Sequence, residues 1–476
     1  MVSNEIAEQR SDIIAKLVAA RLEKGITQAE LANMIGTQRS NICRLESGAQ
    51  NPTVDMLLKI SAALGKRLEL ELSDKEETVV QTYVLKLYDT ELLRFSLSER
   101  GLEGLKAELI SVNKDLQPLF PYGLELTGEG VISWLKSRVV PKNRRFVAEI
   151  LASFGLNAND TKGIIDVCMG LSLNDSYWVV EEDFKGSFAD YNLYENRFSE
   201  ILSLVAYTGV EQSHGGFTTS PELTTGGALP KAWRFIDGDG IYLYKGGNDI
   251  LTHGGNEPYS EYYASQIASQ MGLNAVCYDL ENWKGILASK CKLFCSIDVS
   301  YVPVWRVIPD VTIKKALDLY DSLGADFGEQ LRSMLAFDAL IYNEDRHFGN
   351  FGLLRDNKTG RFIAPAPMFD HGHSLFSQAA PEKFEDLEAY SKTLTTPYEG
   401  LTFDKIAVEV IGKSQISQLR KMANFTFKRH ASLNLDEGRL QKIEAFIRRR
   451  AVQLLALAKS HTHEKRSLRK DQDADV

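Results

Sequence analysis

The sequence has no long apolar run, few cysteines and no excess of positive charge. A membrane-spanning helix needs about 18 or more consecutive apolar residues, and the chain contains no such run, so we expect no membrane partner. The five cysteines are scattered, and Cys291 and Cys295 lack the second pair that a zinc site would need. The first residues, MVSNEIAEQRSD, are polar and mixed in charge, unlike a signal peptide. These features favour a reduced, cytoplasmic location.

Size and charge divide the chain into regions. At 476 residues it exceeds one typical core, so we expect two or three domains of ordinary globular composition. The net charge of −9 argues against a general polyanion binder. Residues 1–72 carry nine Lys or Arg and nine Asp or Glu, so any DNA binding there requires a local basic face. Residues 461–476 have little apolar content and are predicted to form a disordered tail.

Short helices with sharp breaks are predicted for residues 11–70. The first apolar stripe ends near Gly25, and Thr27 is the predicted N-cap of the next helix, with Glu30 at the capping-box position. Thr37 is expected to cap a third helix, TQRSNICRLESG, with Ile42 and Leu45 facing inward. After a break at Asn51-Pro52, a fourth amphipathic helix is indicated by Val54, Leu57, Leu58, Ile60 and Leu64.

The segment ITQAELANMIGTQRSNICRLESGAQNPTVDMLLKISAALG resembles the Xre/Cro family of helix-turn-helix domains. The resemblance implies that residues 1–72 bind DNA with the helix from Thr37 in the major groove. Amide and guanidinium side chains pair with purine edges. The residues expected to face bases are Gln38, Arg39 and Asn41, and those expected to meet phosphates are Gln28 and Arg44.

Domains of this family usually bind as dimers, so the resemblance implies a homodimer on an inverted-repeat operator in double-stranded DNA. A small helical interaction domain with a solvated polar face is the alternative interpretation. The charged stretch SDKEET at 73–78 is interpreted as a linker.

Residues 338–376 contain three polar side chains in the sequence order that is typical of a phosphoryl-transfer site. Asp345 precedes Asn350 by five residues, and Asp370 follows twenty residues later. One carboxylate would act on the incoming hydroxyl, while the amide and the second carboxylate would hold Mg²⁺ on a triphosphate. Apolar residues Phe351 to Leu354, a turn ending at Gly360 and a returning strand predict a hairpin that brings Asp370 back beside Asn350.

Upstream residues offer a nucleotide site. Gly226-Gly227 lies before a strand-like segment, and a flexible backbone of this kind can donate N–H groups to phosphates. The strand IYLYK ends in Lys245, in the arrangement that kinases use to hold α- and β-phosphates. The helix from Glu257 to Met271 offers Glu261 as the preferred partner of Lys245, with Glu257 as the competitor. A hinge near Phe294 to Asp298, including Ser296, would bind adenine through its backbone.

Together, YNEDRHFGN, MFDHGH and the upstream lysine resemble the HipA-like kinase family over roughly residues 200–450. The resemblance implies a two-lobed fold that uses ATP and Mg²⁺. Asp345 would be the catalytic base, Asn350 and Asp370 would hold Mg²⁺, Lys245 would contact ATP, and His347 would order the loop.

The resemblance implies an N-lobe (201–300) and a C-lobe (301–460), and we expect residues 79–200 to form an accessory region packed on the kinase. The acceptor would be a protein Ser or Thr hydroxyl, on a translation component such as an aminoacyl-tRNA synthetase.

Two departures from the family pattern leave the biological role open. Residues 79–200 do not follow the family's N-terminal region. The family also usually keeps its DNA-binding antitoxin on a separate chain, whereas here both parts are fused. A toxin, a self-restrained toxin and a regulator are therefore all open.

Two other activities compete with an active kinase. One is a metal-dependent hydrolase, in which Asp345, His347, Asp370, His371 and His373 supply ligands. That hypothesis gives Asn350, Lys245 and the glycine pair no role. The other is a transcriptional regulator whose kinase-like domain is inactive and senses nucleotide.

Hydroxyl side chains crowd the glycine pair, at Thr218, Thr219, Ser220, Thr224 and Thr225. They are ordinary turn residues. The HipA resemblance adds a second hypothesis, autophosphorylation, because those kinases can phosphorylate this loop in their own chain. Ser220 is favoured because Pro221 holds it extended.

Overall fold

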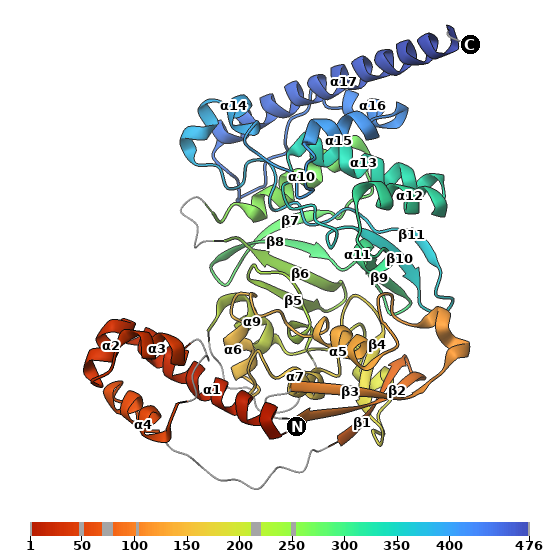
Figure 1. Cartoon of the computed structure of the whole chain (residues 1–476). Helices are drawn as coiled ribbons and strands as arrows, with labels where there is room; N and C mark the ends of the chain where they lie inside the picture. The colour runs from red at the N-terminus through yellow and green to blue at the C-terminus, as the bar shows by residue number, and fades with distance from the viewer. Residues whose placement is uncertain are drawn as a thin grey trace. The chain divides into compact units, whose positions relative to one another are not determined.

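The computed structural model describes residues 2–46, 52–68, 80–100, 104–210, 220–248 and 254–474. Contacts divide the chain into two units (Figure 1). The first unit comprises Met1–Gln81 and Leu97–Lys106, and the second comprises Thr82–Ser96 and Ala107–Val476. The linker predicted at 73–78 lies outside the described residues. The fold class is as predicted: an all-helical N-terminal domain is followed by a mixed α and β region.

The described residues of the N-terminal domain form the helices α1 (Val2–Glu23), α2 (Gln28–Met34), α3 (Arg39–Glu46) and α4 (Val54–Ala63). The capping box is confirmed, because Thr27 Oγ1 accepts the Glu30 N–H at 3.2 Å and the Glu30 carboxylate accepts the Thr27 N–H at 2.8 Å. Ile42 and Leu45 are buried as predicted, in one core with residues of the other three helices. An ion pair between Arg21 Nε and Glu46 Oε1, at 2.6 Å, links α1 to α3.

Two details of this domain differ from the prediction. Helix α3 begins at Arg39, so Gln38 lies just before it rather than within it. Of the apolar residues that indicated the fourth helix, Val54 and Leu58 are 53% and 43% exposed. Helical periodicity turns these two away from the inward stripe of Leu57, Ile60 and Leu64.

The accessory region contains an antiparallel sheet of order β3-β2-β1-β4. Its strands are β1 (Val80–Leu87), β2 (Thr90–Arg100), β3 (Gly104–Val112) and β4 (Tyr177–Glu181). Strand β1 pairs antiparallel with β4. Its helices are η2 (Lys114–Leu119), α5 (Gly128–Lys136), α6 (Val147–Ala152), α7 (Thr161–Cys168) and α8 (Phe188–Tyr191).

The predicted N-lobe is built on a second antiparallel sheet, of order β5-β6-β8-β7. Its strands are β5 (Lys231–Ile236), β6 (Gly240–Gly246), β7 (Tyr278–Trp283) and β8 (Ile286–Lys292). Neighbouring residues of a strand point to opposite faces. Tyr244 packs with Tyr207 of α9 (Glu200–Thr208), and Lys245 bonds to Glu261 of α10 (Glu257–Met271). Helices α9 and α10 therefore lie on opposite faces of this sheet. The short helix η3 (Pro221–Leu223) precedes β5.

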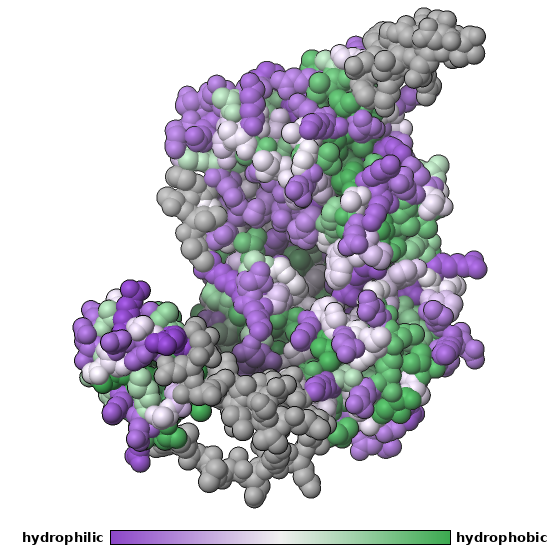
Figure 2. All heavy atoms as spheres, in the orientation of Figure 1, coloured by the Kyte–Doolittle hydropathy of each residue, from purple (hydrophilic) through white to green (hydrophobic). Residues whose placement is uncertain are grey.

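The predicted C-lobe packs around α13 (Ala325–Ile341), whose buried residues enter the main core of the second unit. The hairpin between Asn350 and Asp370 is confirmed: β10 (Gly352–Asp356) pairs antiparallel with β11 (Phe362–Pro365), and β9 (Val299–Pro303) pairs with β10. The remaining helices are α11 (Val304–Val307), α12 (Ile313–Leu323), η4 (Pro381–Glu385), α14 (Leu387–Ser391), α15 (Phe403–Val410), α16 (Lys413–Arg420) and α17 (Glu437–Ala474). The surface over α14 and the adjoining part of α17 is largely hydrophilic (Figure 2).

The accessory region contacts the kinase-like region at two points. Arg355 of β10 is buried and donates to Phe120 O at 3.0 Å, while Ser176 Oγ donates to Ile297 O at 2.6 Å. The first contact joins the accessory region to the predicted C-lobe, and the second joins it to the segment between β8 and β9.

The tail differs from the prediction. Helix α17 continues to Ala474, through residues expected to be disordered. Lys, Arg and Glu are good helix formers, so a polar segment can extend a helix that packing has already nucleated. Among the described residues, no helix combines the length and apolar character that crossing a bilayer requires.

Candidate active site and nucleic-acid interface

Lys245, Glu261 and Asp370 meet in one buried cluster. Lys245 is the penultimate residue of β6, and its Nζ donates to Glu261 Oε1 at 2.9 Å and to the Asp370 carboxylate. Glu261 lies in the second turn of α10, and its other oxygen accepts the backbone N–H of His371 at 2.8 Å. The rival Glu257 instead accepts the Asn248 N–H at 3.1 Å. The structure thus brings Lys245 to Glu261, the partner preferred on sequence grounds.

The charges of this cluster stabilise one another. Burial alone would raise the pKa of Asp370, but the Lys245 ammonium holds that pKa well below its usual range. Burial alone would lower the pKa of Lys245, but Asp370 and Glu261 raise it. Asp370 also has a left-handed backbone, with φ of +57°, which is costly for a residue with a side chain and is typical of functional sites.

Arg346 joins the two catalytic loops, and the sequence analysis missed it. Its buried guanidinium pairs with Asp338 of α13 (Nε to Oδ2, 2.9 Å) and donates to Asn350 O at 2.9 Å. It also donates to Phe369 O and faces His371 Nδ1 at 2.9 Å, on either side of Asp370. Asp338, a carboxylate inside an apolar helical pattern, was the available signal that a buried cation lay nearby.

The loop after α13 presents the other predicted catalytic residues. Asn350 Nδ2 donates to Asp345 O at 2.8 Å, which leaves Asn350 Oδ1 free to bind a ligand. The Asp345 side chain is half-buried, and its carboxylate forms no hydrogen bond or ion pair with the described residues. His347 is exposed, and its Nδ1 accepts the Gly349 N–H at 3.0 Å, so the ring orders this turn.

Asn350 and Asp370 fit a magnesium ion. Both offer oxygen atoms, the ligands that Mg²⁺ prefers, and the depressed pKa of Asp370 keeps its carboxylate ionised. The ligand set of the hydrolase hypothesis does not assemble. Among the described residues, no three His, Cys, Asp or Glu side chains are grouped to hold a metal. His371 is buried against Arg346, whereas His347 is exposed.

The glycine pair lies beside a second lysine, which the sequence analysis also missed. Gly227 has φ of +85°, a backbone conformation that strains any residue with a Cβ, so glycine is favoured at this position. Lys231 Nζ donates to Gly226 O at 2.9 Å, and Lys231 pairs directly with Lys245 across β5 and β6. Burial and the neighbouring Lys245 lower the pKa of Lys231 to about 7. The two strand-like segments on either side of the Asp237–Gly240 turn were the available signal, because a hairpin there pairs Lys231 with Lys245.

The described hydroxyl side chains before β5 form hydrogen bonds within the protein in this conformation. Ser220 is 1% exposed, and its Oγ accepts the Glu222 N–H at 3.3 Å. Thr224 Oγ1 donates to Leu171 O at 2.8 Å, and Thr225 Oγ1 donates to Pro221 O at 2.6 Å. Thr218 and Thr219 lie outside the described residues. Autophosphorylation here would require the segment to leave its packed position.

The predicted adenine hinge lies between β8 and β9. The Phe294 ring packs 5.5 Å from that of Phe369, the residue before Asp370. The Ser296 N–H donates to Val299 O at 3.0 Å, and Ser296 O accepts the Val299 N–H at 3.1 Å. The backbone of Ser296 is thus used within the turn, so the role predicted for it in adenine binding stays a prediction.

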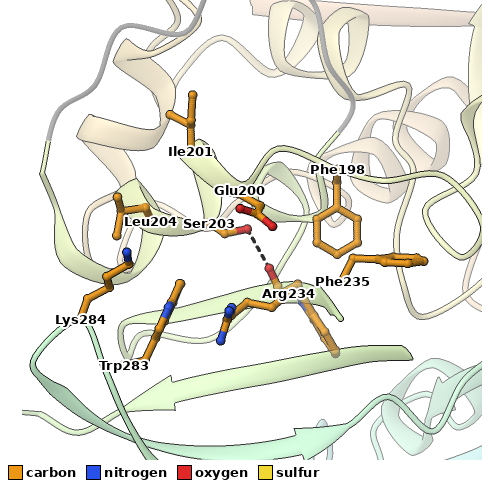
Figure 3. A pocket seen from close by; sticks show the side chains of 10 residues that line it. Phe198, Glu200, Ile201, Ser203, Leu204, Arg234, Phe235, Trp283 and Lys284 are labelled. Carbon is orange, nitrogen blue, oxygen red and sulfur yellow. Dashed lines mark hydrogen bonds between the residues drawn. The ribbon is translucent and has the colours of Figure 1, made fainter. Parts of the chain in front are cut away.

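A cavity of about 240 Å³ lies on the face of the sheet that α9 covers (Figure 3). It is lined by side chains of α9, β5 and the β7–β8 turn, and Ser203 donates to Trp233 O at 2.7 Å at its edge. Its ten lining residues include none of the predicted site residues. Because Lys245 points to the opposite face, this cavity is separate from the charged cluster.

The candidate DNA-reading residues are exposed or half-exposed around α3. Gln38, Arg39 and Arg44 are exposed, and Arg44 Nη2 donates to Asn41 Oδ1 at 3.2 Å. Gln28 lies at the start of α2, with its Nε2 donating to Glu46 Oε2 at 2.9 Å. Gln38, Arg39, Asn41 and Arg44 thus lie on or next to α3. The Gln28 side chain is instead held within the domain, and it would contact DNA only if its hydrogen bond to Glu46 broke.

Known sequences match the N-terminal domain. The family described as helix-turn-helix matches residues 17–70. A protein of Haemophilus influenzae described as an HTH-type transcriptional regulator is 38% identical over 61 residues, covering 13% of this chain and 62% of its own length. A protein of Archaeoglobus fulgidus with the same description is 40% identical over 58 residues, covering 12% of this chain and 83% of its own length. The chain therefore spans less than two thirds of the Haemophilus protein.

Two solved structures are similar to longer parts of the chain. The proinflammatory kinase CtkA of Helicobacter pylori has 18% identity and a TM-score of 0.40, covering 52% of this chain and 95% of its own. The Shewanella oneidensis MR-1 toxin-antitoxin complex of HipA, HipB and operator DNA has 15% identity and a TM-score of 0.46, covering 79% of this chain and 97% of the matched chain.

Proposed function

Because the chain belongs to the helix-turn-helix family through residues 17–70, we propose that it joins a sequence-specific DNA-binding domain to an ATP-dependent protein serine/threonine kinase. The main support for the kinase is the convergence of Lys245, Glu261 and Asp370. Arg346 adds to it by joining Asp370 to the Asp345–Asn350 loop. Glu261 and Asp370 lie 109 positions apart in the chain, yet both carboxylates pair with the same lysine. Such a convergence of charges on a buried cation is typical of functional sites.

The roles of the residues follow from their positions. Lys245 and the amides of Gly226 and Gly227 bind the triphosphate. Mg²⁺ held by Asn350 Oδ1 and Asp370 would neutralise charge on the phosphate oxygens. Asp345, with a carboxylate that no described residue engages, accepts the proton of a Ser or Thr hydroxyl.

The reaction transfers one phosphoryl group. The acceptor oxygen forms a bond to the γ-phosphorus, its proton moves to the Asp345 carboxylate, and the bond from phosphorus to the β-phosphate oxygen breaks to release ADP. The acceptor is a protein hydroxyl, and the resemblance of the YNEDRHFGN motif to HipA-like kinases favours a translation component in the cytoplasm. The DNA target is an inverted repeat bound by a homodimer, as expected near the protein's own promoter.

Incubation with Mg-ATP and cell lysate, followed by intact-mass and phosphopeptide analysis, tests the kinase. We expect phosphate on Ser or Thr residues of wild-type samples. Asp345→Asn should lower transfer by about 10²–10⁴-fold, the usual contribution of a general base, and leave ATP binding largely intact. Phosphorylation by Asp345→Asn at the wild-type rate would remove Asp345 from this role.

One observation favours a second candidate, an inactive nucleotide-sensing regulator. Lys245 holds the Asp370 carboxylate, the group that would have to bind the metal. In that case DNA affinity would change on addition of ATP while no ATP is consumed. A turnover measurement beside a DNA titration separates the two functions.

A further inference from the structure

Backbone hydrogen bonds from the accessory region hold both sides of the Gly226-Gly227 pair. Ahead of the pair, the Val140 N–H donates to Leu223 O at 2.7 Å. Behind it, the Arg145 N–H donates to Ala228 O at 2.9 Å. The two glycines between these points are exposed. Their amides are therefore presented on a short segment whose ends are fixed by another part of the fold.

A buried guanidinium between these two bonds reaches the same segment. Arg144 Nη1 donates to Glu222 O at 2.8 Å and to Thr225 O at 3.2 Å, and Nη2 donates to Lys231 O at 2.9 Å. Nη2 also pairs with the Glu222 carboxylate, whose other oxygen accepts the Trp233 N–H at 2.7 Å. One side chain of the accessory region thus contacts residues before the glycine pair and the first residue of β5 after it.

The ion pair is better suited to fixing geometry than to adding stability. The side chains of Arg144 and Glu222 are both 0% exposed, and removing two charges from water costs much of what their attraction returns. Apolar residues of similar size would often stabilise a protein as well or better. Only a planar fork with several donors bonds to three carbonyl groups and a carboxylate at once.

We propose that Arg144 is a positioning residue: with Glu222 it fixes residues 220–231 so that the Gly226 and Gly227 amides and Lys231 face the phosphates of the nucleotide. This inference rests on the proposed nucleotide site and gives the accessory region its role. The region is then an obligatory part of the phosphate-binding site, and it acts by holding residues 220–231.

The decisive variant replaces both charges, Arg144→Met with Glu222→Met, because removing only one would leave a buried charge without a partner. Lys142→Met is the matched control, since Lys142 lies in the same turn, is exposed and bonds only to Asn159 among the described residues, at 2.5 Å. Binding of Mg-ATP and of adenosine is titrated for the full chain, with thermal melting recorded for each variant.

We expect the double variant to bind Mg-ATP about tenfold more weakly and adenosine as tightly as the wild type, because the predicted adenine hinge at 294–298 lies outside this segment. Arg144→Lys keeps the charge but loses the planar guanidinium, so its Mg-ATP affinity should lie between those of the wild type and the double variant. Lys142→Met should match the wild type. Unchanged Mg-ATP affinity in the double variant would overturn the proposal, and so would equal losses for Mg-ATP and adenosine, which indicate general damage.

Hydrogen exchange tests the positioning role of Arg144 independently of nucleotide binding. The backbone amides of residues 220–228 should exchange at least tenfold faster in the double variant than in the wild type, without any nucleotide present. If the wild type binds neither Mg-ATP nor adenosine, the proposed function fails, and this exchange measurement still decides the positioning role. Equal exchange in the two proteins would refute it.

Discussion

Lys231 provides the sharpest link between the structure and a measurable pH dependence. It is buried in β5, its ammonium bonds to Gly226 O at 2.9 Å, and it pairs across the sheet with Lys245. Burial and the like charge of Lys245 lower its pKa from 10.5 to about 7. Near neutral pH the free protein therefore carries Lys231 partly uncharged, beside the residues that we assign to phosphate binding.

The sign and size of the effect follow from linkage. An unfolded chain keeps this proton up to about pH 10.5, whereas the folded chain loses it near pH 7, so folding releases a proton between these values. A displacement of this size corresponds to about 5 kcal/mol of folding free energy, a penalty that is present in full below pH 7. The penalty disappears as pH rises from 7 to 10.5, and stability should rise over that window.

Phosphate oxygens favour the charged ammonium, so ATP binding should take up a proton once pH exceeds about 7. Each further pH unit should then weaken ATP binding by up to about tenfold, or about 1.4 kcal/mol. Lys245 does not contribute to this slope, because Asp370 and Glu261 raise its pKa.

Calorimetric titration of Mg-ATP between about pH 6 and 9, in two buffers of different ionisation enthalpy, counts the protons taken up. The comparison is wild type against Lys231→Met, so that the titration of ATP itself cancels. We expect uptake approaching one proton per site in the wild type near pH 8 and none attributable to the protein in the variant. Equal proton uptake and equal pH slopes in the two proteins would refute the assignment of Lys231.

Other residues give independent tests. Asp370→Asn should weaken binding of Mg-ATP but not of metal-free adenosine, as titrations with and without Mg²⁺ would show, since the lost carboxylate is a metal ligand. Arg39→Ala should cost about 1–3 kcal/mol on the preferred operator and relax base preference, whereas Arg44→Ala should weaken all sequences alike in gel shifts; unchanged preference in Arg39→Ala would argue against base contact. Arg346→Met leaves the buried Asp338 carboxylate without its ion-pair partner, so the free energy of unfolding in urea should fall by about 3–5 kcal/mol. Arg332→Met, which removes a more exposed ion pair, should lower it by less than about 1 kcal/mol.

Local features of the fold were predictable because neighbouring residues decide them. Thr27 and Glu30 lie within one helical turn, so their capping box is visible in the sequence and present in the structure. The hairpin between Asn350 and Asp370 follows from its turn residues, and α10 spans the predicted residues Glu257 to Met271. The tail was predicted wrongly because polar composition alone does not reveal that it continues a helix that begins at Glu437 and is packed in the core through Leu440.

Residue types and their order can be read from the sequence: a helix-turn-helix pattern, then a lysine, a glutamate, and the Asp345, Asn350 and Asp370 set. Which of these residues meet depends on how the chain folds. The positions of Lys231 beside Lys245, and of Arg346 between two loops, depend on strand register and on burial, which join residues far apart in the chain. Arg144 is the clearest case, because its partner Glu222 lies 78 residues away and the sequence alone marks it only as one of several surface cations.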